Sequence, residues 1–243
     1  MDLHGRVALV TGAARRVGRA IALRLAAAGC HVAVHYGRSR DEASEVVAAC
    51  EALGARSAAF EADLADATGA GALATRVHEH FGRLDILVNN AAVFDPMTVD
   101  GFDLAAWERT LRVNLTAAMS LVHAAAPALR AARGRVVNIS DAAVERPWPD
   151  HLAYIVSKGA LDVLTRALAR ALAPEVNVVG VAPGVAEWPE TYDTATRERL
   201  TRRIPLGRAG SAADVAAAVH YLLRDGDYVT GSILRVDGGR HVC

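Results

Sequence analysis

The sequence predicts one α/β domain, doubly wound around a mainly parallel sheet of about seven strands with helices on both faces. Strand-like and helix-like segments alternate with short connections, the pattern of parallel strands joined by helical crossovers. The chain has 243 residues, 52% of them hydrophobic, which is enough for one large core. No repeat period and no linker rich in Gly, Pro or Ser divides it, so residues 1–243 are expected to form a single domain.

Each strand is predicted from a short apolar run that ends at a turn or a polar residue. The first run, Val7–Val10, ends in Thr11-Gly12, and an Ala-rich helical stretch follows through Ala28. The remaining strands are expected at His31–Tyr36, Ser57–Glu61, Ile86–Asn89, Val136–Ser140, Asn177–Ala182 and Ile233–Val236. Beyond the helix expected to end near Leu53, helices are expected at Thr68–Phe81, Trp107–Ala132, Ala153–Ala173 and Ser211–Leu223.

Three local patterns predict details of these elements. Ser39-Arg40-Asp41-Glu42 matches a capping box, which opens a helix through reciprocal side-chain bonds to the backbone. Pro127 should kink or interrupt the long Trp107–Ala132 helix, because proline has no backbone N–H to donate. The segment 187–203 has no clear periodicity, which makes it a candidate substrate lid.

The composition excludes several classes of function. Basic and acidic residues balance at 27 each, so we expect no nucleic-acid partner. No segment is long and apolar enough for a membrane span or a signal-peptide core, so we expect no membrane partner and a cytoplasmic location. Cys30, Cys50 and Cys243 are too few and too irregularly spaced for a disulfide framework or a zinc site, and no metal is expected.

The turn after the first strand has features of a dinucleotide-binding loop. Gly12 and Gly18 lie where the strand passes into the helix, so that the backbone can approach a pyrophosphate and the helix N-terminus offers free N–H groups. A plain strand-to-helix turn is the alternative, since two glycines alone are a weak signal. Other cofactor contacts expected in this half of the chain are Arg15, Arg16, Val17, His35 and Tyr36, with Asp63 and Leu64 at the adenine edge.

The end of the second strand predicts NADPH rather than NADH. A free ribose 2′-hydroxyl usually meets an Asp or Glu at this place. Here the chain reads His35-Tyr36-Gly37-Arg38-Ser39, with no acid before Asp41. Arg38 and Ser39 can supply charged and neutral hydrogen bonds to a 2′-phosphate, with a further contribution from Arg15.

Lys158 is the only lysine among the 27 basic residues, and it follows Tyr154 by four positions. Residues four apart share one face of a helix. An ammonium beside a phenol of ordinary pKa about 10 should favour the phenolate and make the hydroxyl a better acid. We therefore expect Tyr154 and Lys158 to form a catalytic pair, with a chance surface lysine as the alternative.

With these pieces placed, the chain resembles the short-chain dehydrogenase/reductase family from about Val7 to Gly239. The matching residues are Thr11-Gly12 with Gly18, Asn89-Asn90-Ala91, Asn114, Tyr154 with Lys158, Pro183-Gly184, and Thr230-Gly231 before Val236-Asp237-Gly238-Gly239. The resemblance implies a Rossmann-type fold, a homotetramer, and hydride transfer between a nicotinamide and a substrate carbon. It implies that Tyr154 donates a proton, that Lys158 binds the ribose hydroxyls, and that Asn114 holds a proton-relay water. It also implies cofactor contacts from Asn90, Ala91, Ala92, Pro183, Gly184 and Val185.

Two departures from the family pattern narrow the prediction. Arg16 replaces the middle glycine of the usual triplet, and Asp141 replaces the serine usually found thirteen residues before the tyrosine. A serine donates a hydrogen bond to a carbonyl oxygen that becomes an alkoxide, whereas an ionised aspartate only accepts and would repel that charge. A carboxylate instead favours a substrate that presents N–H groups, as a pterin does.

Both departures resemble the pteridine reductase branch of the family, which includes dihydromonapterin and dihydrofolate reductases of this fold. The resemblance implies that Asp141, Tyr154 and Lys158 act in catalysis, that Phe94 stacks on the pterin, and that Arg16 contacts its oxygen side. The predicted reaction is NADPH-dependent reduction of a dihydropterin (dihydromonapterin, dihydrobiopterin or dihydrofolate) to the tetrahydropterin. Ala92 departs from trypanosomatid-type pteridine reductases, which carry a serine there. The alternatives are a carbonyl reductase, for example of 3-oxoacyl thioesters, and a non-catalytic NADPH-sensing protein.

Overall fold

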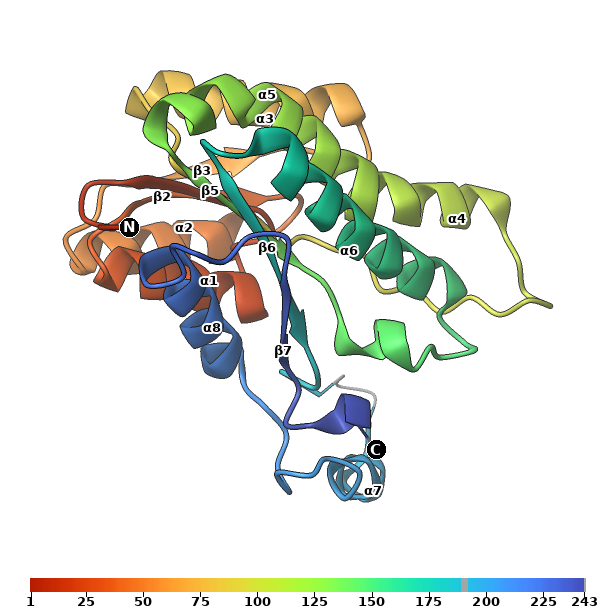
Figure 1. The fold of residues 1–243 in the computed structure, drawn as a ribbon. Helices are drawn as coiled ribbons and strands as arrows, with labels where there is room; N and C mark the ends of the chain where they lie inside the picture. Colours follow the sequence, from red (N-terminus) through yellow and green to blue (C-terminus); the bar gives the residue numbers. More distant parts are fainter. Residues whose placement is uncertain (189–191, 243) are drawn as a thin grey trace.

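Seven parallel strands form the sheet in residues 1–188 and 192–242, the part of the chain that the computed structural model describes (Figure 1). They are β1 (Val7–Val10), β2 (His31–Tyr36), β3 (Ser57–Glu61), β4 (Ile86–Asn89), β5 (Arg135–Ile139), β6 (Asn177–Pro183) and β7 (Ile233–Val236). Their order is β3-β2-β1-β4-β5-β6-β7, and every pairing is parallel. The predicted doubly wound fold is confirmed. The winding reverses between β1 and β4, where folds of this type bind ligands outside the carboxyl ends of the strands.

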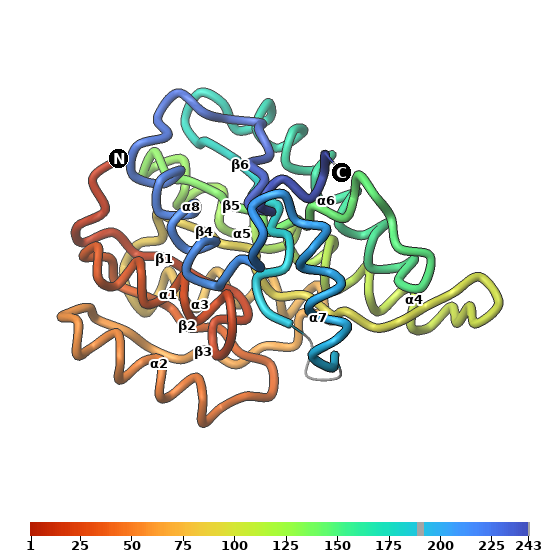
Figure 2. Tube along the Cα trace, turned by 90° about the horizontal axis from the view of Figure 1, so that it is seen from below, coloured from red at the N-terminus to blue at the C-terminus, as the bar shows by residue number. Residues whose placement is uncertain are grey.

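Helices cover both faces of the sheet, and each face has its own apolar core (Figures 1 and 2). On one face α1 (Arg16–Ala27) packs against α2 (Arg40–Ala52) and α8 (Ala212–Arg224). On the other face α5 (Ala117–Ala132) packs against α3 (Ala67–Phe81) and α6 (Leu152–Leu172). The central strands β1 and β4 are buried along their whole length, because apolar side chains point into both cores.

The helix predicted at Trp107–Ala132 is interrupted, but not where we expected. It begins earlier, as α4 (Leu104–Leu111), with the Asp103 carboxylate capping the N–H groups of its first turn. A π-helical turn, η1 (Arg112–Thr116), then joins α4 to α5. Pro127 lies inside α5, which continues to Ala132, so of the expected kink or interruption, the interruption does not occur at this residue. Burial on both sides of the proline outweighs one lost hydrogen bond, since most helical stability comes from packing of the apolar face.

Two further predictions need correction or extension. The capping box at Ser39 is absent from the described structure, because the Ser39 side chain makes no capping bond and Glu42 instead lies 3.6 Å from the guanidinium of Arg15. The segment 187–203 contains a helix, α7 (Thr194–Thr201), which Asp193 caps. Residues 189–191 of that segment, including Pro189, lie outside the described residues.

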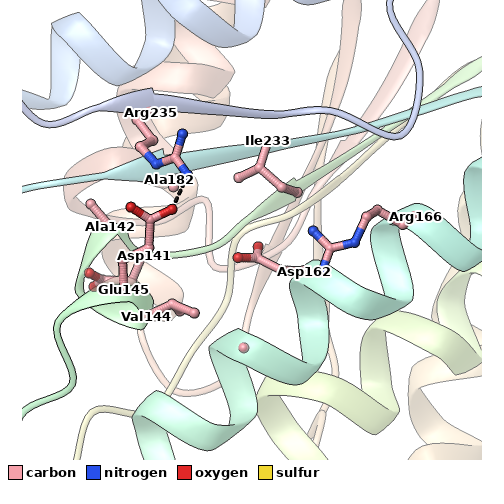
Figure 3. A pocket seen from close by; sticks show the side chains of 10 residues that line it. Asp141, Ala142, Val144, Glu145, Asp162, Arg166, Ala182, Ile233 and Arg235 are labelled. Carbon is pink, nitrogen blue, oxygen red and sulfur yellow. Dashed lines mark hydrogen bonds and ion pairs between the residues drawn. The ribbon is translucent and has the colours of Figure 1, made fainter. Parts of the chain in front are cut away.

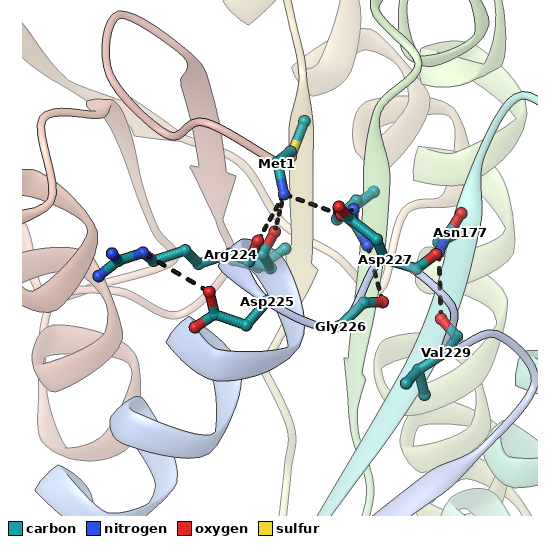
Figure 4. Close-up of polar contacts among 9 residues, drawn as sticks. Met1, Asn177, Arg224, Asp225, Gly226, Asp227 and Val229 are labelled. Atoms are coloured by element: carbon teal, nitrogen blue, oxygen red, sulfur yellow. Dashed lines mark hydrogen bonds and ion pairs between the residues drawn. The ribbon is translucent and has the colours of Figure 1, made fainter.

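Polar contacts connect the N-terminus with the amino ends of β5 and β6 (Figure 4). The Met1 ammonium donates to the Arg224 carbonyl and to the carboxylate of Asp227. Asp227 also pairs with Arg135 at the start of β5, and its carbonyl accepts from the side chain of Asn177 at the start of β6. Within the described residues, no helix combines the length and the apolar character needed to cross a membrane.

Candidate active site

Asp141 and Tyr154 meet beyond the carboxyl end of β5. Asp141 caps a short 3-10 helix, η2 (Ala142–Glu145), by accepting the Ala143 N–H at Oδ1, 2.8 Å away. Its other oxygen, Oδ2, accepts the Tyr154 hydroxyl at 2.7 Å. Tyr154 lies in the first turn of α6 and is buried. The two residues expected to act together are therefore in direct contact.

The electrostatics of this pair differ from the sequence-based expectation. Burial raises the pKa of Asp141. Burial and the adjacent Asp141 carboxylate hold the pKa of Tyr154 well above its usual value. The pKa of this hydroxyl is thus displaced upward, opposite to the direction expected from Lys158 alone. Tyr154 is therefore a persistent hydrogen-bond donor near neutral pH.

Lys158 is fully enclosed under the tyrosine. Its Nζ donates to the Ile139 carbonyl at 2.7 Å and lies 5.7 Å from the centroid of the Tyr154 ring. Burial lowers the pKa of Lys158 to about 8, although the carboxylates of Asp141 and Asp162 act in the opposite direction. The ammonium is therefore close to titration at a mildly alkaline pH.

Asn114 lies in the π-helical turn and holds the loop after β4. Its Oδ1 accepts the Val93 N–H at 2.8 Å, and its Nδ2 donates to the Val93 carbonyl and to Ser157 Oγ, both at 3.0 Å. Ser157 in turn donates to the Tyr154 carbonyl. The amide group of Asn114 thus joins the loop that carries Phe94 to the helix that carries the catalytic candidates.

An aromatic cluster forms one wall of the site. The Phe94 ring stacks on His151, with centroids 4.2 Å apart and planes 15° apart. The ring is also T-shaped to those of Tyr154 and Trp148, with centroids 4.7 and 5.9 Å away. Phe94 remains 43% exposed, so part of its surface is open to a ligand. Sequence reasoning assigned no role to Trp148 or His151, and their spacing gave no signal, because they meet Phe94 only through the fold.

The turn between β1 and α1 fits the pyrophosphate of a dinucleotide. A Cβ on Gly18 would lie 2.1 Å from the Gly12 carbonyl oxygen, and one on Gly12 would lie 3.0 Å from the Ala91 Cα, so neither position has room for a side chain. Asn90 Nδ2 donates to the Thr11 carbonyl at 2.8 Å, and the Thr11 hydroxyl accepts from the backbone N–H of Ala91 at 3.0 Å. These bonds fix the turn against the end of β4 and leave the start of α1 facing the expected cofactor edge.

His35, one of the predicted cofactor contacts, supports this turn from within the protein. It is buried, its Nδ1 accepts the Gly12 N–H at 3.0 Å, and its Nε2 lies 3.2 Å from the Ala62 carbonyl. Burial lowers the pKa of His35 to about 4, so the ring is neutral and Nε2 carries its proton. Tyr36 is also buried, and its hydroxyl donates to Glu61. The side chains of both residues are therefore buried beneath the cofactor region and support its backbone.

The arginines of the cofactor region have different environments. Arg38 is exposed and makes no hydrogen bond or ion pair with any residue that the structure describes, so it is available to a 2′-phosphate. Arg15 lies near Glu42. Arg16 has a φ of 54°, in the left-handed region that costs a side-chain-bearing residue about 1–2 kcal/mol. Its Nε donates to Glu187 at 2.7 Å, so an acid from the segment 187–203 pairs with the guanidinium that was expected to contact the substrate.

The remaining predicted cofactor contacts are spread along the carboxyl edge of the sheet. Asp63 is exposed and bonds the Ala65 N–H, whereas the Leu64 side chain belongs to the apolar core. Gly184, between Pro183 and Val185, donates its N–H to the Val236 carbonyl, and a Cβ there would lie 2.8 Å from the Asp237 Cα. Val17, Ser39 and Ala92 are at least partly accessible. In residues 1–188 and 192–242 no cluster of His, Cys, Asp and Glu could hold a metal.

A cavity of about 330 Å³ adjoins Asp141 but is separate from the aromatic wall (Figure 3). Asp162 and Arg166 of α6 line it together with Ile233 and Arg235 of β7. Arg235 forms an ion pair with Glu145 across its rim. Its lining includes Asp141 but, among the described residues, neither Tyr154 nor Phe94, so this cavity does not extend to the tyrosine hydroxyl or to the aromatic wall.

Known proteins are similar to this chain over nearly its whole length. The family model described as enoyl-(acyl carrier protein) reductase matches residues 12–241. A 3-oxoacyl-(acyl-carrier-protein) reductase, FabG of Staphylococcus aureus (strain Mu50), is 35% identical over 240 residues, which are 97% of this chain and 98% of the relative.

Two solved structures are equally similar in fold. A blue fluorescent protein from a metagenomic library, in complex with NADPH, has a TM-score of 0.93 and 34% identity, covering 99% of both chains. FolM alternative dihydrofolate reductase 1 from Brucella canis, complexed with NADP, has a TM-score of 0.93 and 34% identity, covering 100% of this chain and 96% of its own. The match of the family model, these likenesses and the Tyr154–Lys158 geometry lead to one conclusion: the chain belongs to the short-chain dehydrogenase/reductase family and is an NAD(P)-dependent oxidoreductase.

Proposed function

We propose that this protein reduces a dihydropterin to the tetrahydropterin with NADPH. One observation carries the proposal: the Asp141 carboxylate accepts the Tyr154 hydroxyl at 2.7 Å. An ionised carboxylate bonds N–H groups and repels a developing alkoxide, so the pair suits a nitrogen heterocycle better than a ketone. The likeness to a solved dihydrofolate reductase of the same fold supports this choice.

The residues around the pair fit a flat heterocycle. The partly exposed Phe94 ring offers a stacking surface beside Tyr154, and such a stack is worth about 0.5–1.5 kcal/mol beyond burial. Asp141 and Tyr154 then hold the N–H edge of the ring, because one oxygen of Asp141 has acceptor capacity beyond the tyrosine bond. Arg16 is the candidate contact for the oxygen side once it leaves Glu187.

NADPH, when bound, supplies the hydride to C6 of the dihydropterin. The glycine turn with Gly12 and Gly18 fits its pyrophosphate, and Arg38 with Ser39 would bind the 2′-phosphate. Lys158 binds the ribose hydroxyls from beneath Tyr154. The proton added at N5 comes from water or through the Tyr154 hydroxyl, whose high pKa keeps it protonated before the transfer. Both named solved relatives hold this cofactor in one oxidation state or the other.

Replacement of Asp141 by serine tests the proposal. Asp141→Ser should lower kcat/KM for dihydrobiopterin by about 10- to 100-fold, since a hydrogen bond to a charged group is worth about 1.5–3 kcal/mol. The same variant should gain activity on a ketone, because serine can donate to an alkoxide. NADPH oxidation is measured with dihydropterins, dihydrofolate and simple ketones.

Tyr154→Phe is the matched control, because it removes the donor of the pair and keeps the carboxylate. It should reduce kcat on every substrate, whereas Asp141→Ser should change the preference between substrates. Unchanged pterin turnover in Asp141→Ser would remove the basis of the assignment.

Reduction of 3-oxoacyl thioesters is the second candidate, favoured by the 35% identity to the staphylococcal reductase. The carboxylate of Asp141 counts against it for the reason given above. Turnover of an acetoacetyl thioester that exceeds that of every dihydropterin would establish this second function. A protein that binds NADPH and oxidises it with neither class would instead be a sensor.

We also propose a homotetramer and a lid function for the segment 187–203. Exposed apolar side chains on α5 and α6, Met119, Val156 and Val163, support contacts between helices of different subunits. Light scattering of the purified protein measures the mass of the assembly.

The Arg16–Glu187 ion pair supports the lid, because it joins this segment to the cofactor turn. The buried free thiols of Cys30 and Cys50 fit a reducing cytoplasm.

A further inference from the structure

Arg240 has an unused cationic group beside the aromatic wall. It begins the final turn of the described chain, η3 (Arg240–Val242), and is half-buried. Its guanidinium carbon lies 5.8 Å from the centroid of the Trp148 ring. Within residues 1–188 and 192–242 its five N–H donors make no hydrogen bond and no ion pair, whereas Arg235 nearby is paired with Glu145.

The backbone around Arg240 is held firmly by Asp237. This buried carboxylate accepts the N–H groups of Gly239 and His241 at 3.0 and 2.7 Å, and the His241 Nδ1 at 2.8 Å. The bonds flank Arg240 on both sides in the sequence. They hold in place the backbone from which the Arg240 side chain extends toward Trp148.

This position connects Arg240 with the reacting groups. The Trp148 ring is T-shaped to Phe94, and Phe94 is T-shaped to Tyr154. The turn η3 packs against η2, the helix that Asp141 caps. The positive charge of Arg240 also favours the ionised form of Asp141, opposing the rise in its pKa caused by burial.

We propose that Arg240 is a specificity-determining residue that binds an anionic group on the side chain of the substrate. The inference rests on the proposed pterin reduction. The ring would occupy the surface of Phe94, with its N–H edge at Asp141 and Tyr154. The bicyclic ring carries no negative charge of its own, so the anion must lie on its substituent, as a carboxylate or a phosphate. A guanidinium binds either group through two parallel N–H bonds, and the stacked, half-buried setting restricts its rotamers before binding.

The test compares anionic and neutral dihydropterins in Arg240→Gln. The readout is the ratio of kcat/KM for dihydrofolate, which has carboxylates, to kcat/KM for neutral dihydrobiopterin. Any effect through the charge on Asp141 applies to both substrates and cancels in the ratio. The ratio should fall by about tenfold or more, mainly through KM, because a remote anchor stabilises ground and transition states equally. Arg240→Lys keeps the charge but loses the two-pronged geometry, and should give an intermediate ratio.

Arg235→Gln is the matched control, because it removes another arginine from the same end of the sheet whose donors already serve Glu145. It should leave the ratio unchanged. The proposal would be overturned if Arg240→Gln left kcat/KM, relative to dihydrobiopterin, unchanged for both dihydrofolate and dihydroneopterin phosphate, or if Arg235→Gln lowered these ratios equally. Dihydroneopterin phosphate serves as a third substrate. A loss for the phosphate alone would identify a phosphate site, and a loss for dihydrofolate alone would identify a carboxylate site.

A binding experiment separates this inference from the proposed function. If the protein reduces no dihydropterin, the proposed function fails, and calorimetric titration of the NADP⁺ complex with folate and with biopterin still tests Arg240. Weaker folate binding in Arg240→Gln, with biopterin binding retained, supports the anion site. Equal folate affinity in both proteins contradicts it.

Discussion

The titration of Lys158 gives a sharp prediction about pH dependence. Burial has lowered the pKa of this lysine to about 8, and the carboxylates of Asp141 and Asp162 keep it from falling further. The charged ammonium is the form that can bind ribose hydroxyls and support Tyr154. Activity should therefore be present at pH values below about 8, the pKa of Lys158, and be lost as the pH rises through this value.

The perturbation is Asp162→Asn, which removes one supporting charge without changing the size of the side chain. Asp162 follows Lys158 by one helical turn of α6, where side chains lie about 5–6 Å apart at Cβ. Two charges about 6 Å apart interact by about 3 kcal/mol at an effective dielectric constant of about 20, an upper limit near 2 pH units. Asp162 is only partly buried, so screening reduces this value and we expect a downward shift of about 1 unit.

The assay is kcat/KM for the accepted substrate from about pH 6 to about pH 10, which reports groups of the free enzyme. The alkaline limb should move from about 8 toward about 7 in Asp162→Asn and stay in place in Asp162→Glu. Lys158→Arg should remove the limb from this range, because guanidinium does not titrate there, although its activity will be lower. An alkaline limb that stays fixed or moves upward in Asp162→Asn would refute the assignment of that limb to Lys158.

Two further predictions concern the cofactor region. Gly18→Ala places a Cβ 2.1 Å from the Gly12 carbonyl oxygen, so it should lower stability by about 1–3 kcal/mol and weaken NADPH binding, as measured by denaturant unfolding and by fluorescence titration. Gly71→Ala is its control, because a Cβ there meets only ordinary contacts and alanine favours the helix; a similar loss in both variants would contradict the crowding argument. Arg38→Asp should shift the ratio of kcat/KM from NADPH toward NADH, since it exchanges a partner for the 2′-phosphate for one suited to a 2′-hydroxyl. An unchanged cofactor ratio would show that Arg38 does not read the phosphate.

The strands were predictable within about one residue because each is a short apolar run buried between two helical layers. The bounds of the helix after β4 were not predictable. A π-helical turn inserts one extra residue between hydrogen-bonded partners, and this leaves no clear mark on the hydrophobic periodicity. The prediction of a capping box at Ser39 was wrong because the pattern considers only neighbouring residue types. Glu42 instead lies near Arg15, which belongs to another part of the chain.

The candidate site was predictable where motif spacing places residues on one helix or one turn. Tyr154 and Lys158 share a helix face, and Gly12 and Gly18 share a turn. Contacts between distant segments were not predictable in this way. His151 beneath the Phe94 ring, Glu187 on Arg16 and Arg240 over Trp148 depend on the winding of the whole chain. The pKa of Tyr154 was predicted in the wrong direction because burial is a property of the folded molecule.

The bond between Asn114 and the Val93 backbone changes how variants of Asn114 should be interpreted. Because the amide group grips both polar atoms of the residue before Phe94, its removal frees the aromatic wall as well as any water held nearby. Lower turnover in such a variant would therefore have two causes, a misplaced substrate and a disrupted proton path. Solvent isotope effects, compared across substrates of different size, would separate the two contributions.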